Sequence, residues 1–386
     1  KAPDLPATTL ASYCYSAMFV RCTSLTQAPN LPVTTLAAYC YSTMFYGCTS
    51  LVNAPDLPAT TLAPGCYNIM FEGCTALVQP PRLGFTEIDM MSASPGTSTS
   101  PCYRMFYGCT SLVNAPSLPA TTIGAYAYAQ MFYGCTSLVN APSLPATTLA
   151  QNCYNSMFYG CTSLVNAPQT LPATTLVRGC YNQMFSGCTA LVNAPEMSFT
   201  NIPDFVSNST NGACYRMFSG CTSLIQVPDF PNATLESCCF ANMFQGCTAL
   251  TNPPALPSTT APGLCYLEMF KGCTSLVRTP QLPATTLDQK CYKNMFNGCT
   301  ALTQASNLPA TTVPLEGYRG MFDGCTSLVN APEIAATTCT TFGGEGDNLR
   351  AMFANCRSLA NPPEIHITTL AKQSLMYMFQ NTAITK

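Results

Sequence analysis

Apolar residues recur along this chain at a spacing of four. Within residues 31–56, Leu36, Cys40 and Met44 stand at i, i+4 and i+8, and aromatic residues follow the last two. This spacing is typical of one face of a helix. It predicts a short helix that begins near Leu36 and ends before Gly47, with its Leu, Cys and Met side chains in a core.

The residues that flank this segment fit a helix with defined ends. Thr35 stands at the expected N-cap, where a hydroxyl accepts a hydrogen bond from the first turn. The expected C-terminal position is Gly in eleven copies of the segment, Asn355 and Asn381 in two, and Arg21 in the first. Because Gly and Asn tolerate a left-handed backbone, we expect a positive φ at this position.

A short strand is expected after this helix. The segment from Cys48 to Pro55 is too short for another helix, and its proline fits the end or edge of a strand. We predict a strand of about four residues in which Leu51 and Ala54 point inward, with Leu57 inward again after the bend.

One supersecondary unit is repeated along the chain, because Met-Phe recurs fourteen times and nine of the thirteen intervals are 26 residues. Such a period predicts an α/β repeat solenoid: a right-handed, leucine-rich-repeat-like stack of about fourteen strand–helix units with a parallel sheet on one face. We expect residues 1–386 to form a single solenoid, and the matching repeat phase of Lys1 and Lys386 suggests a fragment of a longer array. The methionines of the signature are Met18, Met44, Met70, Met105, Met131, Met157, Met184, Met217, Met243, Met269, Met295, Met321, Met352 and Met378.

The amino-acid composition limits the classes of partner that this chain is expected to bind. Charged residues make up 8% of the chain and the formal net charge is −2, so there is no basic stripe for nucleic acid. Apolar runs fall short of the roughly 18 to 20 residues that a membrane span needs. We therefore expect no nucleic-acid partner and no membrane span, and neither a signal nor an anchor is evident in the sequence.

The string Gly-Cys-Thr-Ser-Leu, as at residues 47–51 and 134–138, resembles the BspA-type leucine-rich repeats of bacterial surface proteins. This unit is longer than the familiar one, because it adds Leu-Pro-Ala-Thr-Thr. The resemblance implies an exported, extracellular or cell-surface bacterial protein used in adhesion or recognition, with a host or cell-surface protein or glycan as partner.

The 25 cysteines admit three interpretations. Buried free thiols that act as small apolar side chains are favoured. A disulfide framework is disfavoured because equivalent cysteines of an in-register stack have parallel Cβ vectors and because the count is odd. A zinc site is disfavoured because Cys-x-x-Cys is absent and His366 is the sole histidine. We predict no cofactor and no metal.

Threonine pairs recur at eleven places, Thr34-Thr35 among them. The favoured interpretation is helix capping by the second threonine. The alternative is a hydroxyl-and-methyl ladder that binds ice. Likewise, the Met-Phe pairs are better explained as core than as a Met-rich binding groove.

Catalysis is not expected, because the sequence has no Ser-His-Asp set, carboxylate pair or phosphate-binding glycine loop. His366, which replaces a proline of the repeat, is expected to be exposed. We predict no catalytic residues and a protein that is not an enzyme.

Two surfaces are candidates for binding. Three insertions, near 84–100, 197–212 and 335–349, are expected to emerge on one edge, although neutral loop tolerance is an alternative. Their candidate residues are Glu87, Asp89, Asp204, Phe205, Glu345 and Asp347. The other surface is an exposed valine ladder, for which simple β-propensity is the alternative; it includes Val52, Val113, Val139 and Val165.

The function predicted from these observations is interaction with a ligand at the cell surface through the solenoid face or the insertion edge. A structural protein that assembles end to end into a fibre is the alternative from another class. Ice binding through the threonine ladder is a third.

Overall fold

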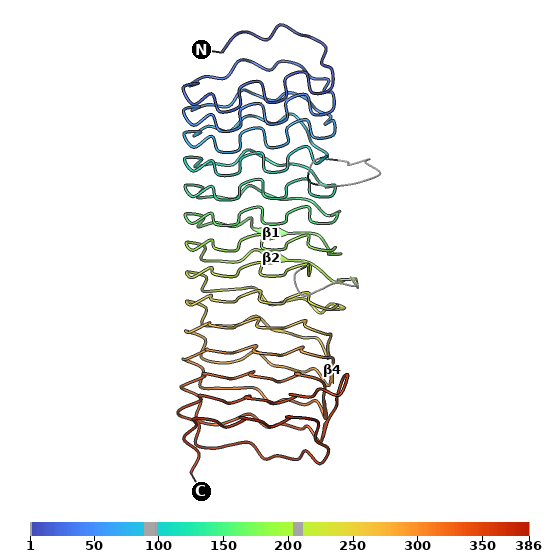
Figure 1. The fold of residues 1–386 in the computed structure, drawn as a ribbon, viewed down its shortest axis with the longest axis vertical. Coiled ribbons are helices and arrows are strands. Elements are labelled where there is room, and N and C mark those ends of the chain that lie inside the picture. Colours follow the sequence, from blue (N-terminus) through green and yellow to red (C-terminus); the bar gives the residue numbers. More distant parts are fainter. Residues whose placement is uncertain (1, 89–96, 98, 204–210, 386) are drawn as a thin grey trace. The chain divides into compact units, whose positions relative to one another are not determined.

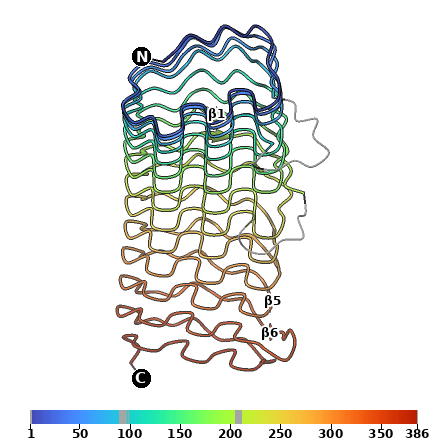
Figure 2. The same cartoon turned by 45° about the horizontal axis from the view of Figure 1, so that its top comes forward.

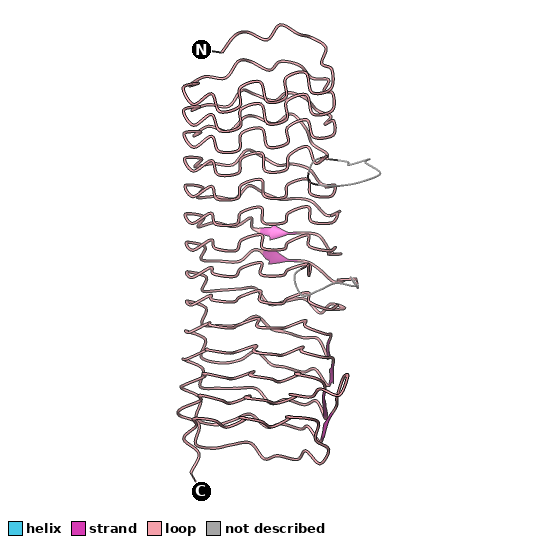
Figure 3. Cartoon of the chain, viewed as in Figure 1, coloured by secondary structure: helices cyan, strands magenta, loops and turns pink. Residues whose placement is uncertain are grey.

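The computed structural model describes residues 2–88, 97, 99–203 and 211–385, and this part of the chain contains six strands of two residues and no helix (Figure 3). The chain divides into two compact units, unit 1 (Lys1–Ser198) and unit 2 (Phe199–Lys386). Each unit is described by itself. That residues 1–386 form one solenoid stays a prediction, and so does the count of about fourteen sequence repeats.

The strands pair in parallel. In unit 1, β1 (Thr170–Leu171) pairs with β2 (Glu196–Met197). In unit 2, β3 (Thr260–Ala261) pairs with β4 (Thr286–Leu287), and β5 (Thr312–Val313) pairs with β6 (Thr338–Cys339). Paired residues belong to consecutive coils of the chain, so the coils of each unit are stacked in register. The colours of Figure 1 follow these coils in sequence order.

Stacked aromatic rings mark the core of each unit. In unit 1, phenylalanines of the repeated signature lie ring on ring at centroid distances of 5.4–5.6 Å; they are Phe19, Phe45, Phe71, Phe106, Phe132, Phe158 and Phe185. In unit 2 the corresponding column runs through Phe218, Phe244, Phe270, Phe296, Phe322, Phe353 and Phe379. Met44, Leu51 and Leu57 are fully buried beside such a column, as the apolar pattern predicts.

The helix predicted after Leu36 is wrong. The segment is a series of turns that gives each coil the stepped course visible in Figure 2. Every second N–H donates within the coil, as from Met44 to the carbonyl of Tyr41 at 3.2 Å. The N–H groups between them donate to the next coil, as from Phe45 to the carbonyl of Met70 at 2.9 Å. Stacking thus satisfies the backbone groups that a helix would pair internally.

A left-handed residue recurs every fourth position in these turns: φ is 56° at Tyr39, 55° at Thr43 and 68° at Gly47. Burial follows the same period of four, because Cys40-Tyr41 and Met44-Phe45 are buried while the pairs between them are half-buried. The spacing that suggests a helix is therefore the spacing of the turns. The left-handed backbone predicted at the glycine position is confirmed, with φ of 55° at Arg21, 60° at Asn355 and 58° at Asn381.

The threonine pairs do not cap helices. In unit 2 the second threonine of four pairs begins β3, β4, β5 or β6, and the residue after it turns inward. Thr260, Thr286 and Thr312 are exposed on this face. The strand predicted around Leu51 is reduced to isolated parallel bridges from Asn53 to Gln27 and to Gln79, and Ala54 is only half-buried.

All 25 cysteines are free thiols, and all but Cys14 and Cys22 are buried, which confirms their predicted burial. In the described part of the chain, no helix is long and apolar enough to cross a membrane.

Candidate functional site

One eight-residue string, Tyr-Gly-Cys-Thr-Ser-Leu-Val-Asn, occurs unchanged four times in unit 1, at 46–53 and in three consecutive coils at 107–114, 133–140 and 159–166. Its Cys and Leu side chains are buried, whereas its Tyr, Thr, Val and Asn side chains are exposed or half-buried. We call these outward side chains the tyrosine–asparagine face. The repetition of one identical string in the sequence is a signal for this face, and the prediction based on separate repeat positions did not include it.

The tyrosines of this face form a stacked row. The rings of Tyr107 and Tyr133 are stacked at 4.5 Å between centroids, and those of Tyr133 and Tyr159 at 4.6 Å. The guanidinium of Arg104 lies 3.9 Å from the Tyr107 ring centroid, in cation–π contact. Because each ring is held by its neighbours, little side-chain freedom remains to be lost on binding.

A strip of three glycines, which carry no side chains, borders the tyrosine row. Gly108, Gly134 and Gly160 have φ near 67–69°, and a Cβ placed on any of them would meet no atom within 4 Å. Exposed threonine hydroxyls lie two residues further along each coil, at Thr110, Thr136 and Thr162. The strip is therefore open to a ligand, with aromatic groups before it and hydroxyls after it in every coil.

The valine ladder predicted from the sequence lies on the same face. Val52, Val113 and Val165 are 39–40% exposed, and Val139 is half-buried. Their predicted outward position is confirmed, whereas their role in binding stays a prediction.

Amides continue the face beyond the valines. Asn140 forms parallel bridges with Asn114 and Asn166, and the Asn166 Nδ2 donates to the Asn140 Oδ1 at 2.7 Å.

A cavity of about 410 Å³ opens at one end of the tyrosine row, lined by Arg21, Thr23, Tyr46, Gly47, Thr49, Glu72, Gly73, Tyr107 and Gly108. Glu72 occupies the sequence position that is tyrosine in the coils on both sides. Its Oε1 lies 3.1 Å from Arg104, but burial outweighs this ion pair and raises the pKa of the carboxyl above its usual value.

The insertion residues are placed only in part. Glu87 is exposed, while Asp89, Asp204 and Phe205 lie outside the described residues. Glu345 is exposed and accepts a hydrogen bond from Lys372 at 2.8 Å. For all of these residues a role in binding stays a prediction.

The third insertion contains a tight hairpin. Phe342 and Glu345 exchange backbone hydrogen bonds of 3.0 and 3.2 Å around Gly343 and Gly344, whose φ angles are 59° and 82°. Two consecutive positive φ angles are typical of a type I′ turn. The turn leaves the Phe342 side chain 68% exposed.

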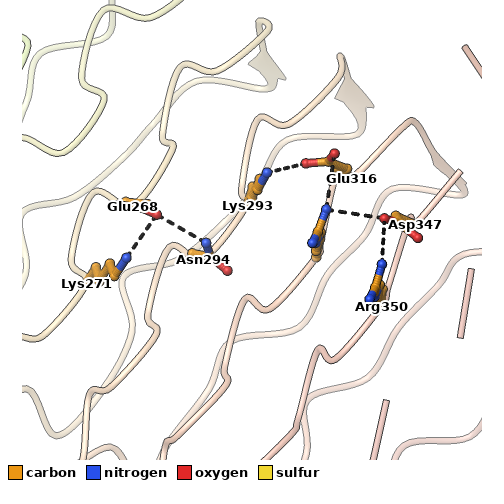
Figure 4. A network of polar contacts seen from close by, with 8 residues as sticks. Glu268, Lys271, Lys293, Asn294, Glu316, Asp347 and Arg350 are labelled. Carbon is orange, nitrogen blue, oxygen red and sulfur yellow. Dashed lines mark hydrogen bonds and ion pairs between the residues drawn. The ribbon is translucent and has the colours of Figure 1, made fainter. Parts of the chain in front are cut away.

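Asp347 belongs to a charge network that crosses several coils of unit 2 (Figure 4). It lies 3.2 Å from both Arg319 and Arg350. Glu316 pairs with Lys293 and, at 3.3 Å, with Arg319. These half-buried pairs hold adjacent coils together, so Asp347 has a partner in its own unit.

Glu268 lies at the centre of a second group of polar contacts in unit 2 (Figure 4). Its carboxylate accepts hydrogen bonds from Lys271 at 3.0 Å, Asn294 at 3.1 Å and Asn242 at 3.0 Å. Burial by itself raises the pKa of Glu268, but the hydrogen bonds from Lys271 and Asn294 reverse this effect and lower it below the usual value. Glu316 is shifted in the same direction, since Lys293 overcomes its burial.

A second cavity, of about 740 Å³, lies in unit 2 among Asn307, Pro332, Glu333, Pro363, Glu364 and His366. His366 is exposed, as predicted, and its Nε2 lies 3.6 Å from Glu364. Among the residues described, no group of three or more His, Cys, Asp or Glu side chains is placed to hold a metal ion.

These stacked, in-register coils with buried leucines define a repeat solenoid of the leucine-rich type, the class to which comparisons with known proteins also point. Residues 94–243 match the model of the BspA type leucine-rich repeat region in six copies. This match covers 150 of the 386 residues and confirms the resemblance found in the sequence. Comparison with curated proteins finds no match.

Two solved structures align with this chain. A leucine-rich repeat protein from Bacteroides ovatus aligns with 96% of this chain and 86% of its own, at 19% identity and a TM-score of 0.50. A leucine rich cell surface protein from Faecalibacterium prausnitzii aligns with 83% of this chain and 76% of its own, at 18% identity and a TM-score of 0.37. The first similarity shows the solenoid fold and no more.

Proposed function

We propose that this chain is a non-enzymatic, extracellular recognition protein that binds a cell-surface protein or glycan through the tyrosine–asparagine face. The observation that carries this proposal is the threefold, in-register display of Tyr, Thr, Val and Asn on consecutive coils of unit 1. The BspA-type repeats at 94–243 support a surface location.

The composition of the face supports recognition. Tyrosine supplies a large contact area at low conformational cost, and Asn and Thr supply adaptable hydrogen bonds, which is the chemistry that antibody binding sites use. The rings are already stacked on one another, and each coil repeats the same groups. A ligand with a repeated chemical unit would meet equivalent contacts at each step along the face.

An array of glycans and cell-surface proteins tests the proposal. Ligands that bind the unmodified chain are measured again with Tyr133→Ala, which removes the central ring of the row, and with Tyr133→Phe, which keeps the ring. We expect at least a tenfold loss of affinity for the alanine variant, about 1.4 kcal/mol, and a smaller loss for phenylalanine.

Thr148→Ser is the matched control, because Thr148 is exposed in the same unit but belongs to a threonine pair. Its affinity should equal that of the unmodified chain. Ligands that bind the Tyr133→Ala variant as tightly as the unmodified chain would contradict the proposal, as would the absence of any ligand in both classes.

Ice binding is a second candidate, because the threonine pairs are not capping residues. In unit 2 the threonines at 259–260, 285–286 and 311–312 are exposed and stacked on consecutive coils, with the Thr285 N–H donating to the Thr259 carbonyl at 3.0 Å. A thermal-hysteresis measurement tests this function. If it holds, the freezing point falls below the melting point, and Thr286→Lys abolishes the gap; coincident freezing and melting points would exclude it.

A further inference from the structure

Two sulfur atoms touch in the core of unit 2. The Sγ atoms of Cys239 and Cys265 lie 3.2 Å apart, and both residues are buried. They occupy equivalent positions in consecutive coils, 26 residues apart. At the other cysteine position of the repeat a thiol donates to a backbone carbonyl, as Cys273 does to Phe244 at 3.1 Å, whereas Cys239 and Cys265 place sulfur against sulfur.

The backbone holds the two cysteines side by side. The N–H of Phe240, the residue after Cys239, donates to the carbonyl of Cys265 at 3.1 Å. The rings of Phe240 and Tyr266, which follow the two cysteines, are stacked at 6.1 Å. Parallel neighbours at the usual strand separation have a Cα distance within the range that a disulfide allows. Parallel Cβ vectors disfavour disulfides along such a stack in general, but at this pair the sulfurs already touch and need to approach by only about 1 Å to reach bonding distance.

We propose that Cys239 and Cys265 are an oxidation site at which a peroxide converts two free thiols into a disulfide between consecutive coils. The thiolate of one cysteine attacks a peroxide oxygen and becomes a sulfenic acid, and the second peroxide oxygen leaves as water after protonation. The other sulfur then displaces the sulfenic oxygen, which leaves as the second water. The sulfurs lose two electrons in total and the peroxide gains them.

The surroundings of the pair explain why the two thiols stay reduced without an oxidant and why an oxidant would join them to each other. Burial, followed by the contact with Cys239, raises the pKa of the Cys265 thiol well above its usual value, so the reactive thiolate is scarce at neutral pH. Hydrogen peroxide is small enough to reach a buried sulfur when a coil opens locally. Once the first sulfur is oxidised, its partner is already in contact with it.

The test treats the folded chain with hydrogen peroxide, blocks the remaining thiols with N-ethylmaleimide, and maps disulfides by mass spectrometry of a non-reduced digest. We expect one dominant cross-linked peptide pair, joining Cys239 to Cys265 with the loss of two hydrogen atoms. Dithiothreitol should remove it completely. Cys265→Ala should abolish the bridge, and Cys291→Ala, a change in the next coil of the same column, should leave it intact.

Two further results decide the question. Peroxide treatment of the chain in denaturant should scatter the bridges over many pairs, because the fold no longer selects one. If the folded chain instead gives a different dominant bridge, such as Cys153 with Cys180, or yields sulfinic acids with no bridge at 239 and 265, the proposal is wrong. The mapping on the unmodified chain does not depend on whether any variant folds.

Discussion

The thiol of Cys135 donates a hydrogen bond to the backbone carbonyl of Phe106 in the preceding coil, at an Sγ–O distance of 3.0 Å. The same contact recurs at 3.0–3.2 Å wherever it is seen in the two units, and its donors include Cys48, Cys74, Cys109, Cys161, Cys188, Cys247, Cys273, Cys299, Cys325 and Cys356. Cysteine at this position therefore fills the core and also joins consecutive coils.

Replacing Cys135 should separate these two roles. The Phe106 carbonyl also accepts from the Cys109 N–H at 3.1 Å, so removing the thiol does not leave it unpaired. We expect Cys135→Ser, which keeps a hydrogen-bond donor and nearly the same volume, to lower the free energy of unfolding by about 1 kcal/mol, because it buries a more polar group. Cys135→Ala should cost about 2 kcal/mol, because it removes the donor and leaves a small cavity. Urea denaturation followed by circular dichroism measures both, and equal losses for the two variants would refute the hydrogen-bonding role.

Gly134 should be required for its backbone conformation and not for space. Its φ is +67° and nothing lies within 4 Å of an added Cβ. Gly134→Ala should therefore destabilise unit 1 by about 1–2 kcal/mol, and Gly134→Asn by less, since Asn tolerates a left-handed backbone better. Gly84→Ala is the contrasting variant: its Cβ would lie 2.5 Å from the Pro58 carbonyl oxygen, so it should cost more than Gly134→Ala. The thermal unfolding temperatures of the three variants give the order of their stabilities.

Thiol reactivity should divide the cysteines into two classes. Cys14 and Cys22 are exposed, whereas the others are buried, and burial raises the pKa of a thiol such as Cys135 to about 12. In a native chain held under reductant, a maleimide should label Cys14 and Cys22 within minutes and the rest only in denaturant. Intact-mass measurement counts the labels, and the double variant Cys14→Ser, Cys22→Ser should remain unlabelled. Rapid labelling of that variant would show that the core is open.

Protonation of Glu268 in acid should make unit 2 less stable. Its pKa in the folded state lies below the unfolded value of about 4.3, so its contribution to stability is complete above that pH and is lost as the pH falls through the folded-state pKa. Glu268→Gln should be less stable than the unmodified chain at pH 7, and the difference should shrink toward pH 3. Unfolding free energies at several pH values provide the check; a difference independent of pH would contradict the predicted linkage.

The pH dependence of stability that Glu72 contributes should have the opposite sign. Burial raises its folded-state pKa, so its contribution favours the folded state below the unfolded pKa of about 4.3 and is lost as the pH rises through the folded-state pKa. Relative to the unmodified chain, Glu72→Gln should therefore gain stability as the pH rises from 3 to 7. The same titration that is applied to Glu268→Gln measures this difference, and parallel curves for the two variants would disprove the assignment.

The sequence by itself determined the period, the core and the left-handed backbone at the glycine position of the repeat. Met44, Phe45 and Cys48 are buried as predicted, and Gly47 has the positive φ that its residue type favours. These properties are local: they follow from the spacing of apolar side chains and from the absence of a Cβ. The outward valines, such as Val113, also followed from their place in the repeat.

Only the tertiary structure decided how the backbone is paired. A spacing of four residues fits both a helix and a series of turns, and the choice depends on whether an N–H such as that of Phe45 bonds within its coil or to Met70 in the next. That partner lies outside any local window, as do Thr260 for Thr286 and Phe106 for Cys135. The same stacking that pairs the backbone aligns Tyr107, Tyr133 and Tyr159 into one face, because identical strings form a surface only when their coils are in register.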